Sequence, residues 1–290
     1  SGNLSGTGNA LANMLRGNAG INVLDGKAGV DVLDGGEGSD IYLVGLASDH
    51  AAAEIADSGN VGSDEVRFAA STSGTLTLFA GDRGIERVVI GSGLGEVAVS
   101  SGTLALDVDA SRVANALSVL GNAGANLLTG TAYADRLDGG AGADRLIGGG
   151  GADTLIGGAG NDVYVVDSGD AIIEASTLAS EIDRVESYVD WILGANLENL
   201  TLLGNGNLAG TGNALNNTLI GNAGANRLDG GLGADILLGG AGDDRYVVDN
   251  LGDKVYETTT SQSDAGGTDT VESSINWTLG NFVENLTLTG

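Results

Sequence analysis

Large apolar residues return every nine positions in three separate stretches of this 290-residue chain. In the middle stretch, five consecutive blocks begin at Gly121 and end at Val165, and every block has Leu or Tyr at its eighth position. Glycines fill the first part of a block, and its last three residues have the length and apolar pattern of a short β-strand. This period predicts an all-β chain whose repeats stack as a parallel β-solenoid.

Each stretch is a run of blocks that ends with a tyrosine. The runs span residues 8–43, 121–165 and 212–247, and they contain four, five and four blocks. We expect the eighth-position side chains to point into a core between two sheets. These side chains are Leu15, Leu24, Leu33 and Tyr42, then Leu128, Leu137, Leu146, Leu155 and Tyr164, then Leu219, Leu228, Leu237 and Tyr246.

The sixth position of each block carries a side-chain oxygen. If six residues form a loop and three form a strand, two blocks complete one coil, and loops 18 residues apart stack about 4.8 Å from each other. A hard cation that takes six to eight oxygen ligands fits between such loops. The predicted ligands are Asn13, Asn22, Asp31 and Asp40, then Asn126, Asp135, Asp144, Asp153 and Asp162, then Asn217, Asn226, Asp235 and Asp244.

Glycine at positions one, two and four is expected to permit positive φ, close backbone approach and inward carbonyl groups. We also predict that the glycines at these positions in the last three loops of the middle run contribute to metal binding, namely Gly139, Gly140, Gly142, Gly148, Gly149, Gly151, Gly157, Gly158 and Gly160. Some entry loops depart from the pattern at position four, where Leu11, Tyr133 and Leu215 replace glycine.

The blocks Gly139–Ile147 and Gly157–Val165 closely resemble the GGxGxDxUx motif of the RTX, or hemolysin-type, calcium-binding repeat family. Strict nonapeptides cover about 40% of the chain. The resemblance implies a right-handed parallel β-roll, calcium in the turns, and export by type I secretion from a Gram-negative bacterium.

Pairing of loops 18 residues apart predicts about seven calcium ions. The pairs are 13/31, 22/40, 126/144, 135/153, 144/162, 217/235 and 226/244. The pairs 135/153 and 144/162 have aspartate on both sides, so we expect them to bind most tightly. A metal-free solenoid is the alternative, but clustered carboxylates repel one another. After the runs, Asp167 with Asp170 and Asp249 with Asp253 could cap a last site, although we favour roles in turns.

The composition further restricts the classes of partner that the chain is expected to bind. The chain has 39 acidic and 12 basic residues, a net charge of −27, which disfavours nucleic acid and favours a multivalent cation. It contains no Cys, and no apolar stretch approaches the roughly 20 residues of a membrane span. The single histidine, His50, is expected at the surface of a spacer, which leaves neither a zinc site nor a catalytic triad. No GxGxxG-like glycine cluster lies in a strand–helix context, which argues against a dinucleotide site.

The segments between the runs also repeat. Residues 182–204 match residues 268–290 at an offset of 86, whereas the last nonapeptides are offset by 82, so we expect a four-residue insertion around 261–264. We divide the chain into a first β-roll block, a divergent spacer, a second block, a spacer, a third block and a final spacer. Their ranges are 1–46, 47–120, 121–170, 171–211, 212–253 and 254–290. We expect the spacers to continue the roll.

These features favour a non-enzymatic calcium-binding segment of a large exported protein, of the adhesin, biofilm or surface-layer type. Residues 205–215 match residues 1–11, which indicates a segment of a longer array and neighbouring repeats as partners. Exposed solenoid ends would also permit head-to-tail self-association. The alternative is the carboxy-terminal calcium-binding module of a secreted enzyme or toxin whose catalytic part lies outside this chain.

Overall fold

The structure is a computed structural model that describes residues 2–50, 54–93, 95, 97–258 and 265–290. The insertion expected around 261–264 lies outside these residues. Within them the only helix is a 3₁₀ turn, η1 (Ala47–Asp49). The chain forms two compact units, residues 1–162 with 169–173, and residues 163–168 with 174–290.

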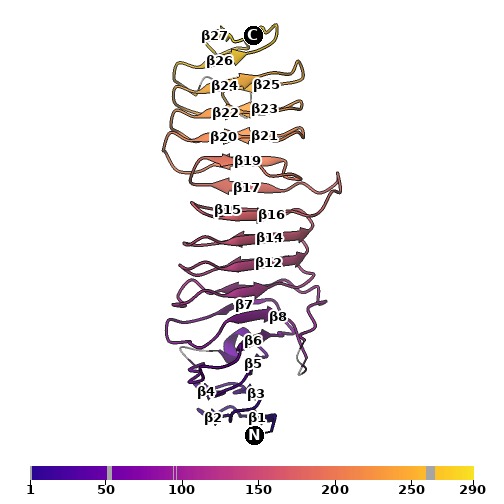
Figure 1. Cartoon of the computed structure of the whole chain (residues 1–290), viewed down its shortest axis with the longest axis vertical. Coiled ribbons are helices and arrows are strands. Elements are labelled where there is room, and N and C mark those ends of the chain that lie inside the picture. Colours follow the sequence, from indigo (N-terminus) through magenta and orange to yellow (C-terminus); the bar gives the residue numbers. More distant parts are fainter. Residues whose placement is uncertain (1, 51–53, 94, 96, 259–264) are drawn as a thin grey trace. The chain divides into compact units, whose positions relative to one another are not determined.

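The first unit consists of stacked parallel strands, several of which are labelled in Figure 1. One sheet has the order β1 (Leu4–Thr7), β3 (Asn22–Asp25), β5 (Ile41–Val44), β6 (Glu65–Phe68), β8 (Arg87–Ile90), β10 (Ser118–Leu120), β12 (Arg136–Ala141), β14 (Thr154–Ala159) and β16 (Ala171–Ile173). Another has the order β7 (Gly74–Thr77), β9 (Leu106–Asp109), β11 (Leu127–Thr129) and β13 (Arg145–Ile147). A further pair joins β2 (Met14–Arg16) to β4 (Val32–Asp34).

Consecutive strands of a run alternate between two sheets, and paired strands are 18 residues apart. In the first unit Leu137 is paired with Leu155 on one sheet, and Leu128 with Leu146 on the other. Two nonapeptides therefore complete one coil, and the predicted parallel β-roll is confirmed.

The second unit repeats this arrangement of stacked parallel strands. One sheet contains β15 (Val163–Val166), β17 (Arg184–Ser187), β19 (Asn199–Leu202), β21 (Thr218–Ile220), β23 (Ile236–Leu238) and β25 (Lys254–Tyr256) in this order. The other contains β18 (Trp191–Ile192), β20 (Ala209–Thr211), β22 (Arg227–Asp229), β24 (Arg245–Val248), β26 (Thr270–Ser273) and β27 (Asn285–Leu288). Leu228 is paired with Tyr246, again 18 residues apart.

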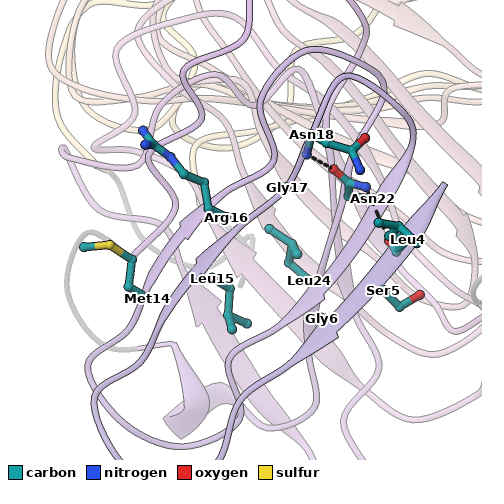
Figure 2. A pocket seen from close by; sticks show the side chains of 10 residues that line it. All are labelled: Leu4, Ser5, Gly6, Met14, Leu15, Arg16, Gly17, Asn18, Asn22 and Leu24. Carbon is teal, nitrogen blue, oxygen red and sulfur yellow. Dashed lines mark hydrogen bonds between the residues drawn. The ribbon is translucent and has the colours of Figure 1, made fainter. Parts of the chain in front are cut away.

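Eighth-position side chains form the core of both units. All of them are buried except Leu15, which is half-buried and lines a pocket with Leu24 in the first coil (Figure 2). The spacers add strands to the same sheets, with Val66 beside Tyr42 in the first unit and Leu200 beside Val185 in the second. Their coils have other lengths, so the spacers continue each roll without the nonapeptide period.

One expectation for the first spacer is wrong. His50 is 5% exposed rather than a surface residue, and its ring nitrogens lie 3.2 Å from Glu54 and 2.9 Å from Asp82. Its imidazole also lies near Phe79, with ring centroids 5.7 Å apart. A polar side chain with two carboxylate partners can be buried at low cost, which sequence spacing alone does not reveal.

No helix in the described part of the chain is long and apolar enough to cross a membrane.

Candidate metal sites in the stacked loops

The structure brings all seven predicted loop pairs together in one geometry. In each pair the sixth-position residue of the loop that comes first in the sequence donates its backbone N–H to Oδ1 of the aspartate 18 residues later, at 2.7–2.8 Å. The donors and acceptors are Asn13 and Asp31, Asn22 and Asp40, Asn126 and Asp144, Asp135 and Asp153, Asp144 and Asp162, Asn217 and Asp235, and Asn226 and Asp244. These bonds form a ladder that holds one oxygen of every aspartate in place.

The first glycine of a block leaves a cradle lined by oxygen atoms. A Cβ added to Gly121 would lie 2.1 Å from the carbonyl oxygen of Gly139 and 2.5 Å from Oδ1 of Asn126. A Cβ on Gly139 would lie 2.4 Å from Oδ2 of Asp144 and 2.8 Å from the carbonyl oxygen of Gly157. A side-chain oxygen and a carbonyl from the next coil therefore converge beside both of these glycines.

Positions two and four need glycine for a different reason. Gly140 and Gly142 have φ of +97° and +125°, and a Cβ on either would lie 2.6–2.7 Å from the carbonyl oxygen of the equivalent residue one coil earlier. The first position has ordinary φ, so the expectation of positive φ there is wrong, and close approach alone explains that glycine. In the three loops without glycine at position four, the carbonyl of the residue at that position keeps the same place. For example, a Cβ on Gly151 would lie 2.7 Å from the carbonyl oxygen of Tyr133.

The loops divide into two classes by what the sixth-position side chain accepts. In the first class the N–H of position two donates to that side chain, as Asn18 does to Oδ1 of Asn22 at 2.6 Å (Figure 2). This class contains the loops of Asn13, Asn22, Asn126, Asp135, Asn217 and Asn226. These loops are closed by the protein's own hydrogen bonds.

In the second class an aspartate oxygen is buried without such a donor. The position-two residue of these loops has positive φ, and Oδ2 of the aspartate accepts no hydrogen bond from the described residues. This holds for Asp31, Asp40, Asp144, Asp235 and Asp244, all at most 1% exposed. Burial raises the pKa of Asp40 and Asp144 to about 6 and the pKa of Asp235 and Asp244 to about 7. None of these five forms an ion pair with a basic side chain in the described part of the chain.

The oxygen atoms around these loops fit calcium as ligands. They are only carboxylate, amide and carbonyl oxygens, and a buried carboxylate without a partner is unfavourable unless it is protonated or binds a cation. Asp135 belongs to the closed class, since Thr131 donates both its N–H and its hydroxyl to that carboxylate. The pairs 135/153 and 144/162 therefore differ in structure although both contain two aspartates, and their tight binding stays a prediction.

The ladder also extends beyond the nonapeptides. Asp170 and Asp253 accept the N–H groups of Asp153 and Asp235 at 3.0 Å, so their role is not confined to turns. In the same way, Glu54, Asp64 and Asp269 accept the backbone N–H groups of Asp31, Asp40 and Asp244, respectively. Sequence reasoning missed these three, although an aspartate two residues before a spacer valine recurs at Asp64, Asp183 and Asp269.

Comparison with known protein families agrees with this geometry. A family model described as the RTX calcium-binding nonapeptide repeat matches four times, at residues 7–42, 120–155, 139–173 and 211–246. The three nonapeptide runs belong to the RTX family. RTX repeats bind calcium, so the match indicates a calcium-binding structural repeat domain. No curated protein matches the chain.

Proposed function

We propose that this RTX chain is a non-enzymatic structural segment of an exported bacterial protein, and that extracellular calcium drives its folding and rigidity. The observation that carries the proposal is the buried Oδ2 without a hydrogen-bond donor, which occurs in each unit, at Asp31, Asp40 and Asp144 and at Asp235 and Asp244. A roll without cations holds these carboxylates in a state that opposes folding.

The charge balance supports a switch from extended to compact chain. At a net charge of −27, self-repulsion favours the expanded chain. About seven calcium ions would neutralise about fourteen charges and link adjacent coils, so the free energy of binding contributes directly to folding. The chain would fold where calcium is abundant, outside the cell.

The place of the segment follows from its repeats. The RTX family supports type I secretion from a Gram-negative bacterium, with the mature protein secreted or at the cell surface. Recurrence of the spacers at 82–86 residues favours a long array, such as an adhesin, biofilm or surface-layer protein, over the tail of an enzyme or toxin. Head-to-tail association of the units stays a prediction.

A calcium titration followed by circular dichroism tests the proposal. We expect little native β-signal in EDTA at pH 7.5 and a cooperative gain as calcium rises to millimolar concentration. Magnesium is the matched control, because it demands a tighter octahedral site and should not replace calcium. An equal β-signal in EDTA and in calcium would refute calcium-driven folding.

A further inference from the structure

The tyrosine that ends each run contacts an acidic residue of the following spacer. In the first unit the hydroxyl of Tyr42 donates to Oδ1 of Asp57 at 2.8 Å and accepts the N–H of Gly35 at 2.9 Å. In the second unit the hydroxyl of Tyr246 donates to Oε1 of Glu257 at 2.8 Å. The aromatic residue thus does more than fill the core, because it positions a spacer carboxylate.

In the first unit this contact completes a cluster of three carboxylates, which we call the first exit cluster. It contains Asp40 from the last nonapeptide and Asp57 and Asp64 from the spacer, and one carboxylate oxygen of each lies within 4.8 Å of the other two. The three residues are 0%, 5% and 6% exposed. Two oxygens bound to one calcium ion lie at most about 5 Å apart, so a single ion can contact all three.

Hydrogen bonds fix the first exit cluster without satisfying it. Oδ1 of Asp64 accepts the N–H of Asp40 at 2.7 Å, and Oδ1 of Asp57 accepts the N–H of Gly36 at 3.0 Å. Oδ2 of Asp40 accepts no hydrogen bond from the described residues. No basic side chain in the described ranges forms an ion pair with these three acids. Three buried like charges at this distance require a cation or protons.

The second unit has acids at the corresponding places after its run, which we call the second exit cluster. It consists of Asp244, Glu257 and Asp269, each at most 2% exposed. Oδ1 of Asp269 accepts the N–H of Asp244 at 2.7 Å, and Oε1 of Glu257 accepts the hydroxyl of Tyr246 at 2.8 Å. Oδ2 of Asp244 and Oε2 of Glu257 accept no hydrogen bond from the described chain.

The sequence after the middle run has the same residue types in the same order. They are Asp162, Tyr164, Glu174 and Asp183. Within the second unit the hydroxyl of Tyr164 donates to Oε2 of Glu174 at 2.6 Å. An acid–tyrosine–acid–acid order is thus found after every run, including the first run, whose spacer diverges from the other two.

We propose that the two exit clusters are calcium sites outside the nonapeptide motif, each of which joins the last loop of a run to the first coils of its spacer. All ligands offered are hard oxygens, and three carboxylates match a divalent cation better than a monovalent one. The exit sites add to the ions of the stacked loops and rely on residues that the nonapeptide period does not include. They would extend calcium-dependent order from the runs into the spacers.

Native mass spectrometry of the whole chain in calcium tests this inference by counting bound ions. Asp64→Asn keeps the oxygen that accepts the Asp40 N–H, and Glu257→Gln keeps the oxygen that accepts the Tyr246 hydroxyl. We expect each variant to bind one ion fewer than the wild type, and the double variant two fewer. The matched control is Asp107→Asn in the first spacer, whose Oδ1 accepts a backbone N–H from Leu127 and which should leave the count unchanged.

The outcomes separate this inference from the proposed function. If the wild type binds several ions and both variants bind the same number, the exit sites are refuted while the loop sites stand. If the wild type binds no ion, both proposals fail. Circular dichroism in calcium verifies folding of each variant. Because the two substitutions lie in different units, a variant that fails to fold leaves the other to decide the question.

Discussion

Replacing Asp144 by Asn should change stability in opposite directions with and without calcium. Asp144 is 1% exposed, its Oδ1 accepts the N–H of Asn126, and its Oδ2 accepts no hydrogen bond from the described chain. Asparagine preserves the first contact and removes the charge. Burial raises the pKa of Asp144 from 3.8 to about 6, which disfavours the ionised form in the folded chain by roughly 3 kcal/mol. Without calcium at pH 7.5, the variant should be more stable by up to roughly 3 kcal/mol.

With calcium the same substitution should destabilise the chain. Asp144 belongs to the loop pairs with Asn126 and with Asp162, so it serves two predicted sites. A site at 100 times its dissociation constant contributes about 2.7 kcal/mol, so weakening one or both should cost about 3–5 kcal/mol. The sign of the change therefore depends on the ion and not on the fold.

Urea denaturation followed by circular dichroism, in EDTA and in millimolar calcium, measures both changes. Where the metal-free wild type is largely unfolded, the stabilisation appears as a larger β-signal in EDTA. Asp190→Asn is the control, because Asp190 is an exposed carboxylate whose Oδ1 also accepts one backbone N–H. A shift of the same sign in both buffers would show that Asp144 acts only through packing, and would refute the reasoning.

Three further predictions follow from the same contacts. Gly158→Ala should destabilise the roll by about 1–3 kcal/mol from its φ of +102° alone, whereas Gly194→Ala, where an added Cβ has its nearest atom at 3.8 Å, should leave the urea midpoint unchanged. Equal midpoints would contradict the steric role of glycine at position two of the block. Leu146→Ala should cost about 2–5 kcal/mol in calcium because Leu146 is fully buried, while Leu127→Ala, at 38% exposure, should cost under about 0.5 kcal/mol, and similar losses would argue against the assigned core. In EDTA, the free energy of unfolding should fall as pH rises from about 4 to 7, because carboxyls such as Asp244, whose pKa is raised from 3.8 to about 7, hold protons in the folded chain that the unfolded chain releases. Denaturation in EDTA at pH 5 and 8 checks this, and greater stability at pH 8 would refute it.

Much of the repeat architecture could be predicted from sequence because a nonapeptide is a local unit. Its glycines, its sixth-position oxygen and its eighth-position side chain recur at one spacing, and a solenoid coil contacts only its neighbours. The pairing of Leu137 with Leu155 and the ladder from Asn126 to Asp144 follow directly from two blocks per coil. The same reasoning failed for the first glycine, whose role depends on a carbonyl one coil away rather than on its own φ.

The period of nine, with its sixth-position oxygens, determined the β-roll and the pairs of loops, and it predicted calcium as the ligand. The tertiary structure decided which loops are closed, since Thr131 donates its N–H and its hydroxyl to Asp135, whereas Oδ2 of Asp144 accepts no hydrogen bond from the described residues. It also buried His50 and brought Asp57 and Asp64 to Asp40. Those spacer residues follow no fixed period, so coil length and strand pairing, rather than spacing in the sequence, place their carboxylates beside the last loop of the run.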